Sequence, residues 1–174
     1  MRKIKDSFII KDNFFDKKTY DKILLDISKS SFTNRNTLIT KEHQNAYQKI
    51  YFSVPLDLNH FAVKEIKNIL KNMGFSLKSS EHNYFLSTKH KESTPHADWH
   101  CDVNCLVYLK GKHLVNSGTG FWDKFDENYI LNSHVGFKEN RAIIFDSKIY
   151  HASLQFNQNC GSRYAMSNFF NYEE

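Results

Sequence analysis

The chain has 174 residues, of which 40% are hydrophobic and 15% are aromatic, so a disordered chain is excluded and a sizeable core is possible. The net charge of +5 comes from scattered basic residues, which indicates a solvated surface and disfavours a nucleic-acid partner. No stretch of the sequence could span a membrane, and the apolar run in the basic N-terminal segment is too short for a signal peptide. The three cysteines lack zinc-finger spacing. We therefore expect a cytoplasmic protein.

The first half of the chain contains two predicted helices. Asp16 can cap a helix over residues 16–28, in which apolar residues recur at positions i, i+3, i+4 and i+7. A second helix with the same kind of stripe is predicted over residues 59–73 and ends at Gly74. We expect strands over residues 7–10 and 48–54, and a polar loop over residues 34–44.

After Gly74 the apolar residues alternate with a period of two, which is typical of strands. The predicted strands cover residues 75–78, 83–89, 104–110, 120–122, 141–145 and 163–171. Helices followed by many short antiparallel strands indicate an α+β, mainly β fold. We expect a double-stranded β-helix (jelly roll) braced by the N-terminal helices, formed as a single domain by residues 1–174.

The sequence Thr94-Pro95-His96-Ala97-Asp98 carries the chemistry that is easiest to interpret. In an extended segment, residues two apart point to the same side, so His96 and Asp98 can direct an imidazole and a carboxylate at one point. A third ligand is available in His151, which follows an apolar strand and a turn. Two histidines and one carboxylate leave other coordination positions open, which is the arrangement of non-haem Fe(II) oxygenases.

Further motifs extend this pattern through the second half of the chain. They are PHAD, the strand CLVYL, GTGFW, the run NRAIIFDSKIYHAS, and RYAMSNFFN, in that order. Together they resemble the Fe(II)/2-oxoglutarate-dependent oxygenases, on the prolyl-hydroxylase-like side of that superfamily. The first half of the chain carries no motif of this kind.

The resemblance implies three cofactors: Fe(II), the cosubstrate 2-oxoglutarate, and O2. His96, Asp98 and His151 would be both the metal ligands and the catalytic residues. Arg163 would bind the far carboxylate of 2-oxoglutarate, because a guanidinium matches a carboxylate bidentately. Tyr108 occupies the position of a family tyrosine that touches the same carboxylate, and Ser167 shares a strand face with Arg163 and would flank the cofactor.

Several alternatives stay open at this point. His100 and Asp102 form a second His-x-Asp pair, although the spacing to Tyr108 favours the first pair, and His100 could instead support a ligand. Arg163 could pair with Asp146, and Tyr108 could be ordinary core. A cupin-like protein could bind zinc or another ion through four ligands, His96, Asp98, His100 and His151, or the chain could be a non-catalytic binding module. The remaining histidines are expected at the surface: His43, His60, His82, His90, His113 and His134.

Within the superfamily, the resemblance favours hydroxylation of an unactivated carbon with release of succinate and CO2. Halogenases lack the carboxylate ligand, whereas Asp98 is present, and nucleic-acid demethylases carry a second arginine where this chain has Phe169. The chain ends soon after the Arg163 strand, so only loops over residues 89–95 and 124–135 are expected to cover the site. An open site suits a residue within a peptide or protein, and the alternative is a free amino acid or another small molecule. The sequence gives no indication of the oligomeric state.

Overall fold

Strands dominate the computed structural model, which describes residues 2–34, 50–79, 82–89, 94–113, 117–155 and 162–173. The helices are α1 (Lys17–Lys29) and α3 (Phe61–Asn72). The strands are β1 (Phe8–Lys11), β2 (Thr33–Asn34), β3 (Ile50–Phe52), β4 (Leu77–Ser79), β5 (Tyr84–Lys89), β6 (Val103–Lys110), β7 (Ser117–Phe125), β8 (Asn128–Gly136), β9 (Ala142–Asp146), β10 (Tyr150–Gln155) and β11 (Ser162–Tyr172). The mainly β fold with helices in the N-terminal half is confirmed, and the loop expected over residues 34–44 lies, except for its first residue, outside the described residues.

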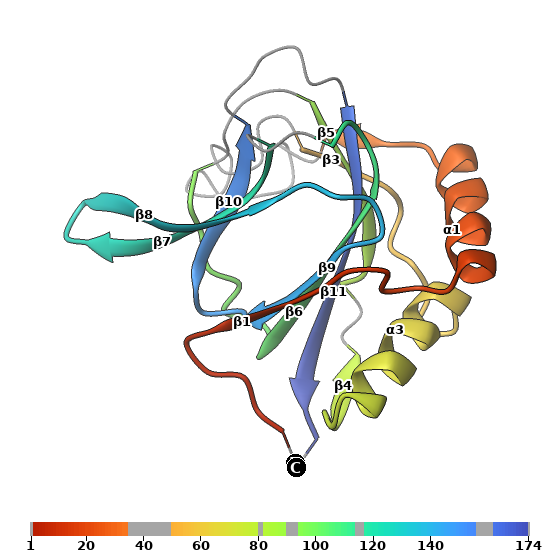
Figure 1. The fold of residues 1–174 in the computed structure, drawn as a ribbon, viewed down its shortest axis with the longest axis horizontal. Helices are drawn as coiled ribbons and strands as arrows, with labels where there is room; N and C mark the ends of the chain where they lie inside the picture. The colour runs from red at the N-terminus through yellow and green to blue at the C-terminus, as the bar shows by residue number, and fades with distance from the viewer. Residues whose placement is uncertain are drawn as a thin grey trace.

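The strands form two antiparallel sheets that face each other (Figure 1). The large sheet has the order β1-β9-β6-β11-β5-β3-β2, and β4 pairs with the end of β11. The small sheet has the order β10-β7-β8. Strands from both ends of the chain therefore belong to the same sheet, because β1 pairs with β9 and the long strand β11 lies between β6 and β5.

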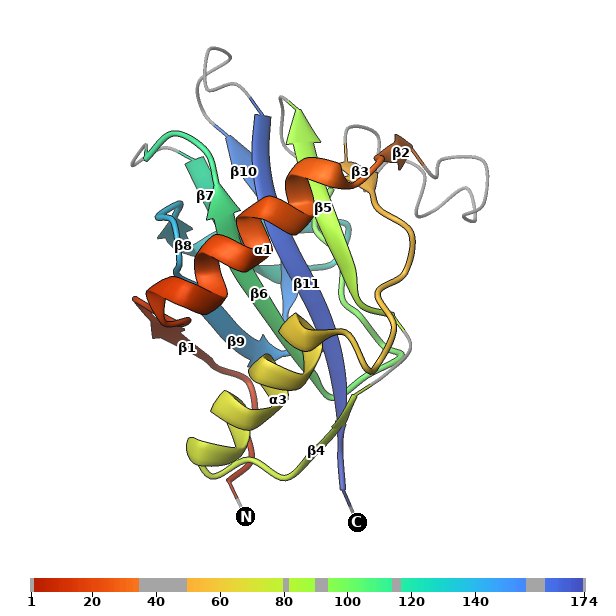
Figure 2. The same ribbon diagram turned by 90° about the vertical axis from the view of Figure 1, so that its right-hand side faces the viewer.

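Both helices cover the outer face of the large sheet (Figure 2). Helix α1 begins where predicted, with the Asp16 carboxylate accepting a hydrogen bond from the Thr19 backbone N–H at 2.8 Å. Each helix buries residues of its predicted apolar stripe in the core: Ile23 and Ile27 from α1, and Val63, Ile66 and Leu70 from α3. Neither described helix combines the length and apolar character needed to cross a membrane.

Strand β6 shows how the large sheet serves two purposes. Its odd-numbered residues, from Val103 to Leu109, are buried in the core under the helices. Its even-numbered residues face the other way, and Asn104, Leu106 and Tyr108 line a cavity between the sheets. Because side chains alternate along a strand, one segment supplies both the core and the wall of the cavity.

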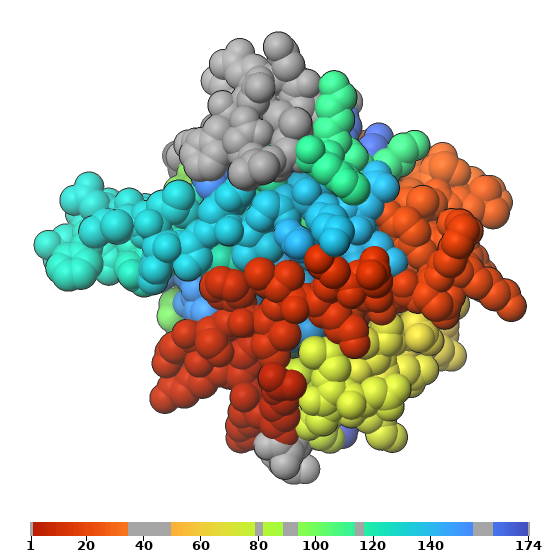
Figure 3. Space-filling view, viewed as in Figure 1, coloured from red at the N-terminus to blue at the C-terminus, as the bar shows by residue number. Residues whose placement is uncertain are grey.

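Strands β7 and β8 form a hairpin where a loop was predicted over residues 124–135. The pairing runs from Gly118 opposite Gly136 to Phe125 opposite Asn128, with a register shift next to Trp122. The far end of the hairpin stands out from the body of the molecule (Figure 3) and exposes Phe125 and Ile130. The loop prediction was therefore wrong, and this stretch does not form a flexible cover.

Candidate metal centre

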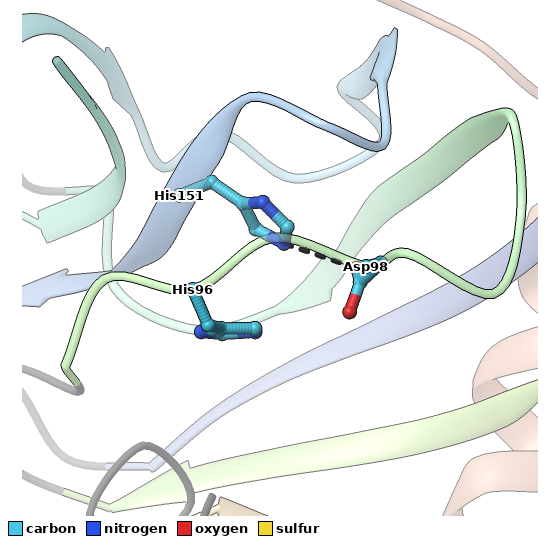
Figure 4. A group of neighbouring side chains, drawn as sticks. All are labelled: His96, Asp98 and His151. Atoms are coloured by element: carbon cyan, nitrogen blue, oxygen red, sulfur yellow. Dashed lines mark ion pairs between the residues drawn. The ribbon is translucent and has the colours of Figure 1, made fainter. Parts of the chain in front are cut away.

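Two backbone segments, one before β6 and one at the start of β10, bring His96, Asp98 and His151 together (Figure 4). One possible ligand atom from each residue lies within 4.8 Å of the others. The backbones of His96 and His151 exchange two hydrogen bonds, of 3.0 and 2.8 Å, and the Asp98 N–H donates to the Ser147 carbonyl at 2.8 Å. The segment before β6 is thus tied to the start of β10, and this holds the three side chains in place.

The hydrogen bonds of the two imidazoles set their tautomers. Nδ1 of His96 lies 3.1 Å from the Thr94 carbonyl oxygen, and Nδ1 of His151 lies 2.9 Å from that of Ile149. A carbonyl oxygen only accepts, so each Nδ1 has to carry the proton, which leaves the Nε2 lone pair for a cation. Protein ligands of metals are oriented in this way by outer hydrogen bonds.

Asp98 is buried, with 5% of its surface exposed. Burial raises the pKa of its carboxyl, but the nearby His151 and His96 outweigh burial and lower the pKa to about 2. One carboxylate oxygen accepts a hydrogen bond from Nδ2 of Asn104 at 2.8 Å and lies 3.2 Å from Nε2 of His151. Because Nδ1 of His151 already carries a proton, a shared proton or a metal ion has to lie between these two atoms. The donor set therefore fits a divalent metal with mixed nitrogen and oxygen ligands.

The second His-x-Asp pair is directed elsewhere. The Asp102 carboxylate accepts a hydrogen bond from the Tyr172 backbone N–H at 2.9 Å. The His100 ring packs against Phe169 and His82, with centroid distances of 4.8 and 5.4 Å. Among the described residues, the group that can share one metal is His96, Asp98 and His151, as the sequence predicted.

Arg163 lies in the same cavity, which has a volume of about 610 Å3, and is 5% exposed. Its guanidinium donates to Oγ of Ser117 at 2.9 Å, to the Gly118 carbonyl at 3.0 Å and to Oγ of Ser153. The alternative partner Asp146 accepts instead from the backbone N–H groups of Asp6 and Lys148. A buried cation at one end of a cavity and a candidate metal site further along it suit a ligand with two carboxylates.

Gly118 explains why the GTGFW motif begins with a glycine. A Cβ at this position would collide with the Val135 carbonyl oxygen, so only glycine lets β7 approach β8 this closely. The same Val135 carbonyl lies 3.3 Å from the Tyr108 hydroxyl, which also donates to Oγ1 of Thr119 at 2.7 Å. Tyr108 is therefore held rigidly in the cavity wall near Arg163.

Ser167 points toward the candidate metal site. Its hydroxyl donates to Oδ1 of Asn104 at 3.4 Å, and the same Asn104 side chain holds Asp98. A role for Ser167 in binding 2-oxoglutarate stays a prediction, as do the cofactor roles of Arg163 and Tyr108.

Sequence reasoning missed Asn104 and Ser153. Asn104 carried a usable signal, because it shares the inward face of its strand with Tyr108. Ser153 is two residues after His151 on β10, so it also faces the cavity. His82 was expected at the surface and is exposed, but it lines the mouth of this cavity.

No protein-family model and no curated protein matches this chain. Solved structures do match. The non-haem 2-oxoglutarate-dependent epimerase SnoN from nogalamycin biosynthesis is 11% identical, with a TM-score of 0.68 over 95% of this chain and 77% of that one. HygX from Streptomyces hygroscopicus, solved with nickel, 2-oxoglutarate and hygromycin B, is 12% identical, with a TM-score of 0.65 over 95% and 82%.

A prolyl hydroxylase from Trichoplax adhaerens, solved with a peptide of hypoxia inducible factor, is 15% identical, with a TM-score of 0.62 over 95% and 83% of the two chains. The resemblance inferred from the sequence is confirmed at the level of the fold, which is that of Fe(II)/2-oxoglutarate oxygenases. The neighbours also carry the cofactors expected here, since SnoN was solved with Fe3+ and α-ketoglutarate and HygX with nickel and 2-oxoglutarate.

Proposed function

We propose that this chain folds as a double-stranded β-helix and is an Fe(II)- and 2-oxoglutarate-dependent dioxygenase. It hydroxylates a carbon of its substrate. His96, Asp98 and His151 hold the metal, and Arg163 binds the far carboxylate of 2-oxoglutarate. When bound, the iron and its cosubstrate supply oxygen activation: one atom of O2 enters succinate, the other becomes the hydroxyl group, and CO2 is released.

One observation supports this proposal: a single cavity contains both the His96, Asp98 and His151 triad, whose histidine tautomers direct Nε2 lone pairs to a metal, and a buried arginine. A binding module without chemistry would not need both features. A zinc site of cupin type would need no buried cation, and its expected fourth ligand, His100, packs instead against Phe169 and His82.

The protein's own residues prepare the site in two ways. The Thr94 and Ile149 carbonyls fix the imidazole tautomers, and Asn104 fixes the orientation of the Asp98 carboxylate. These contacts exist before any ligand binds, so binding would cost little reorganisation.

The test is an anaerobic titration of the protein with Fe(II) and 2-oxoglutarate, followed by exposure to air. We expect a weak visible charge-transfer band that requires both additions, and then succinate. Fe(II) with succinate in place of 2-oxoglutarate is the control. Tight zinc binding with no band and no succinate would instead support the metal-binding alternative.

Mass analysis of the product separates hydroxylation from other outcomes, since SnoN is an epimerase. A gain of one oxygen atom in the substrate supports hydroxylation, whereas an unchanged mass with inverted stereochemistry contradicts it. A residue within a peptide or protein as the target stays a prediction, and the β7–β8 hairpin takes the place of one of the loops on which that prediction relied.

A further inference from the structure

Strand β8 forms an edge of the small sheet, because its single partner among the described strands is β7. The far end of the β7–β8 hairpin has no further described strand beside it, since the pairing of β7 with β10 ends at Trp122 opposite Tyr150. Beyond that point, residues 123–125 and 128–130 form a two-stranded ribbon that projects from the body of the molecule (Figure 1). An isolated pair of strands is only marginally stable in water, so this ribbon would gain stability from a further strand.

The edge of β8 lacks the features that normally prevent an edge strand from pairing with another chain. Natural edge strands are short, carry lysine or proline, or are covered by another segment. Among the described edge strands, β1 ends at Lys11, β2 and β4 have two and three residues, and β10 is bridged at His151 to His96. Strand β8 has nine residues and contains no lysine, arginine, aspartate, glutamate or proline. Within the described part of the chain, the outer backbone groups of residues 128–132 are therefore open to a partner strand.

The side chains at the far end of the hairpin also fit a partner. Phe125, Ile130 and Leu131 are large apolar residues with 68%, 56% and 41% of their surface exposed. Phe125 is opposite Asn128, two residues before Ile130, so Phe125 and Ile130 share one face of the hairpin and Leu131 lies on the other. Apolar side chains on both faces are typical of a strand inside a sheet, and their exposure at one place marks a surface that another molecule covers.

The sequence of this edge is complementary to itself. From Asn128 to Asn132 it reads Asn-Tyr-Ile-Leu-Asn, with an amide at each end and apolar residues between them. Antiparallel pairing of two copies about Ile130 places Ile130 opposite itself. The pairs on either side are Tyr129 with Leu131, and Asn128 with Asn132. Each apolar residue then meets an apolar residue, each amide meets an amide, and no charge meets a like charge. A two-fold interface requires this property, because both copies contribute the same patch.

We propose that the β8 edges of two copies of this chain pair antiparallel about a two-fold axis at Ile130, which joins the two three-stranded small sheets into one continuous sheet. The pairing gives each ribbon a third strand and places the apolar side chains of the two copies side by side. Because both open edges are used, association stops at the dimer. The inference does not depend on the proposed function, since none of the residues 128–132 lines the cavity.

The first test measures the mass of the metal-free protein by sedimentation velocity at concentrations from about 1 to 300 μM, because a small interface associates weakly. We expect the mass to rise from 20.5 kDa to twice that value and no further. A mass of 20.5 kDa throughout, or continued growth beyond the dimer, would overturn the proposal. A monomer that binds an extended peptide of unrelated sequence would overturn it too, and would assign the edge to another polypeptide.

Two double variants test the register of the pairing. Asn128→Lys with Asn132→Lys places like charges opposite each other in both outer pairs, and should abolish the dimer. Asn128→Glu with Asn132→Lys places opposite charges in the same pairs, and should keep it. Both variants lose the hydrogen bond from Asn132 to Asp123, so they are matched in their effect on the monomer. Loss of the dimer in both variants, or in neither, would contradict pairing about Ile130.

A cysteine at the two-fold axis tests the same pairing without relying on affinity. Ile130→Cys places two thiols directly opposite each other, with Cβ atoms about 4.5–5.5 Å apart, so mild oxidation should link the two copies covalently. Non-reducing electrophoresis measures the link, and the original chain gives the background from its own cysteines. Phe125→Cys is the matched control, because this exposed position lies on β7, away from the axis, and cysteines more than about 7 Å apart cannot be joined. Equal linking in both variants, or no linking in Ile130→Cys, would overturn the proposal.

Discussion

The two faces of the large sheet differ in what they tolerate. On the outer face, β6 and β11 direct Val103, Val107, Met166 and other apolar residues into a closed core under the helices. On the inner face, the residues between them are Asn104, Tyr108, Arg163 and Ser167, and they line a cavity. The strands are the same, so the difference lies wholly in the alternating side chains.

This comparison separates stability from chemistry within single strands. The outer residues gain their free energy from burial of apolar surface, whereas the inner residues are polar groups kept out of water by hydrogen bonds. A change on the outer face should therefore lower the free energy of unfolding and leave ligand affinity intact. A change on the inner face should lower ligand affinity and leave the free energy of unfolding largely intact.

The largest effect should follow from removing a triad residue. Asp98→Ala or His151→Ala should lower the affinity for Mn(II) or Fe(II) by more than the roughly 10–100-fold that loss of an outer hydrogen-bond partner costs, and abolish succinate production. Isothermal titration and succinate assays measure both. His113→Ala, which removes an exposed histidine beside Glu139, is the control. Loss of metal affinity in His100→Ala but not in His96→Ala would transfer the ligand role to His100.

Removing Arg163 should be nearly as severe for the cosubstrate. Arg163→Ala leaves the far carboxylate of 2-oxoglutarate buried without its partner, which should cost about 3–5 kcal/mol of binding free energy. Arg163→Lys should recover only part of this loss, because an ammonium keeps the positive charge but cannot form the bidentate contact. Titration of 2-oxoglutarate into the Mn(II) protein measures the affinity.

The matched control for Arg163 is Arg141→Ala. Arg141 is a guanidinium outside the cavity lining that pairs with Asp12, with Nε to Oδ1 at 2.6 Å. Its loss should leave the 2-oxoglutarate affinity within about twofold of the original. An unchanged affinity in Arg163→Ala would contradict the assigned role.

The outer face is tested by Met166→Ala, because Met166 is fully buried in the core under the helices. The cavity left by the substitution should lower the free energy of unfolding by about 2–5 kcal/mol. Urea unfolding of the metal-free protein measures the loss. Affinities for metal and 2-oxoglutarate, measured well below the unfolding transition, should stay the same, and a parallel loss of both would argue against independent faces.

The smallest effect is expected for Asn104→Ala, which removes the hydrogen bond to Asp98 without removing a metal ligand. Metal affinity should fall about 10–100-fold, and the charge-transfer band should shift as the carboxylate changes orientation. Asn168→Ala is the control, since Asn168 is fully buried and donates to the Cys105 carbonyl instead. That variant should lose stability and keep the position of the band.

Much of this arrangement could be read from the sequence because it depends on local periodicity. The stripes of α1 and α3 and the alternation of β6 and β11 follow from spacing alone. The same rule brought His96 and Asp98 together, and the turn before His151 made it a plausible third ligand. The resemblance then supplied a reason to look at Arg163.

What the sequence hid depends on pairing between distant segments or on unusual turns. The β7–β8 hairpin turns at Asp126-Glu127, with φ of 50° at Asp126, and lacks the Asn-Gly or Asp-Gly pair that marks most tight hairpins. The three consecutive apolar residues Tyr129, Ile130 and Leu131 also break the alternation expected of a strand. The cavity lining joins residues from Ile50 to Phe169, so its formation depends on the order of strands in the sheet.

The alternation along β11 also determines which mutations the strand can tolerate, because insertions and deletions act differently from point substitutions. An insertion or deletion of one residue between Arg163 and Met166 would reverse the faces of everything beyond it, sending Ser167 and Phe169 toward the helices and Met166 and Phe170 into the cavity. A change of two residues would keep the faces and only shift the register. Point substitutions can thus alter the cavity gradually, whereas a single-residue change in length within this strand would remove fold and chemistry in one step.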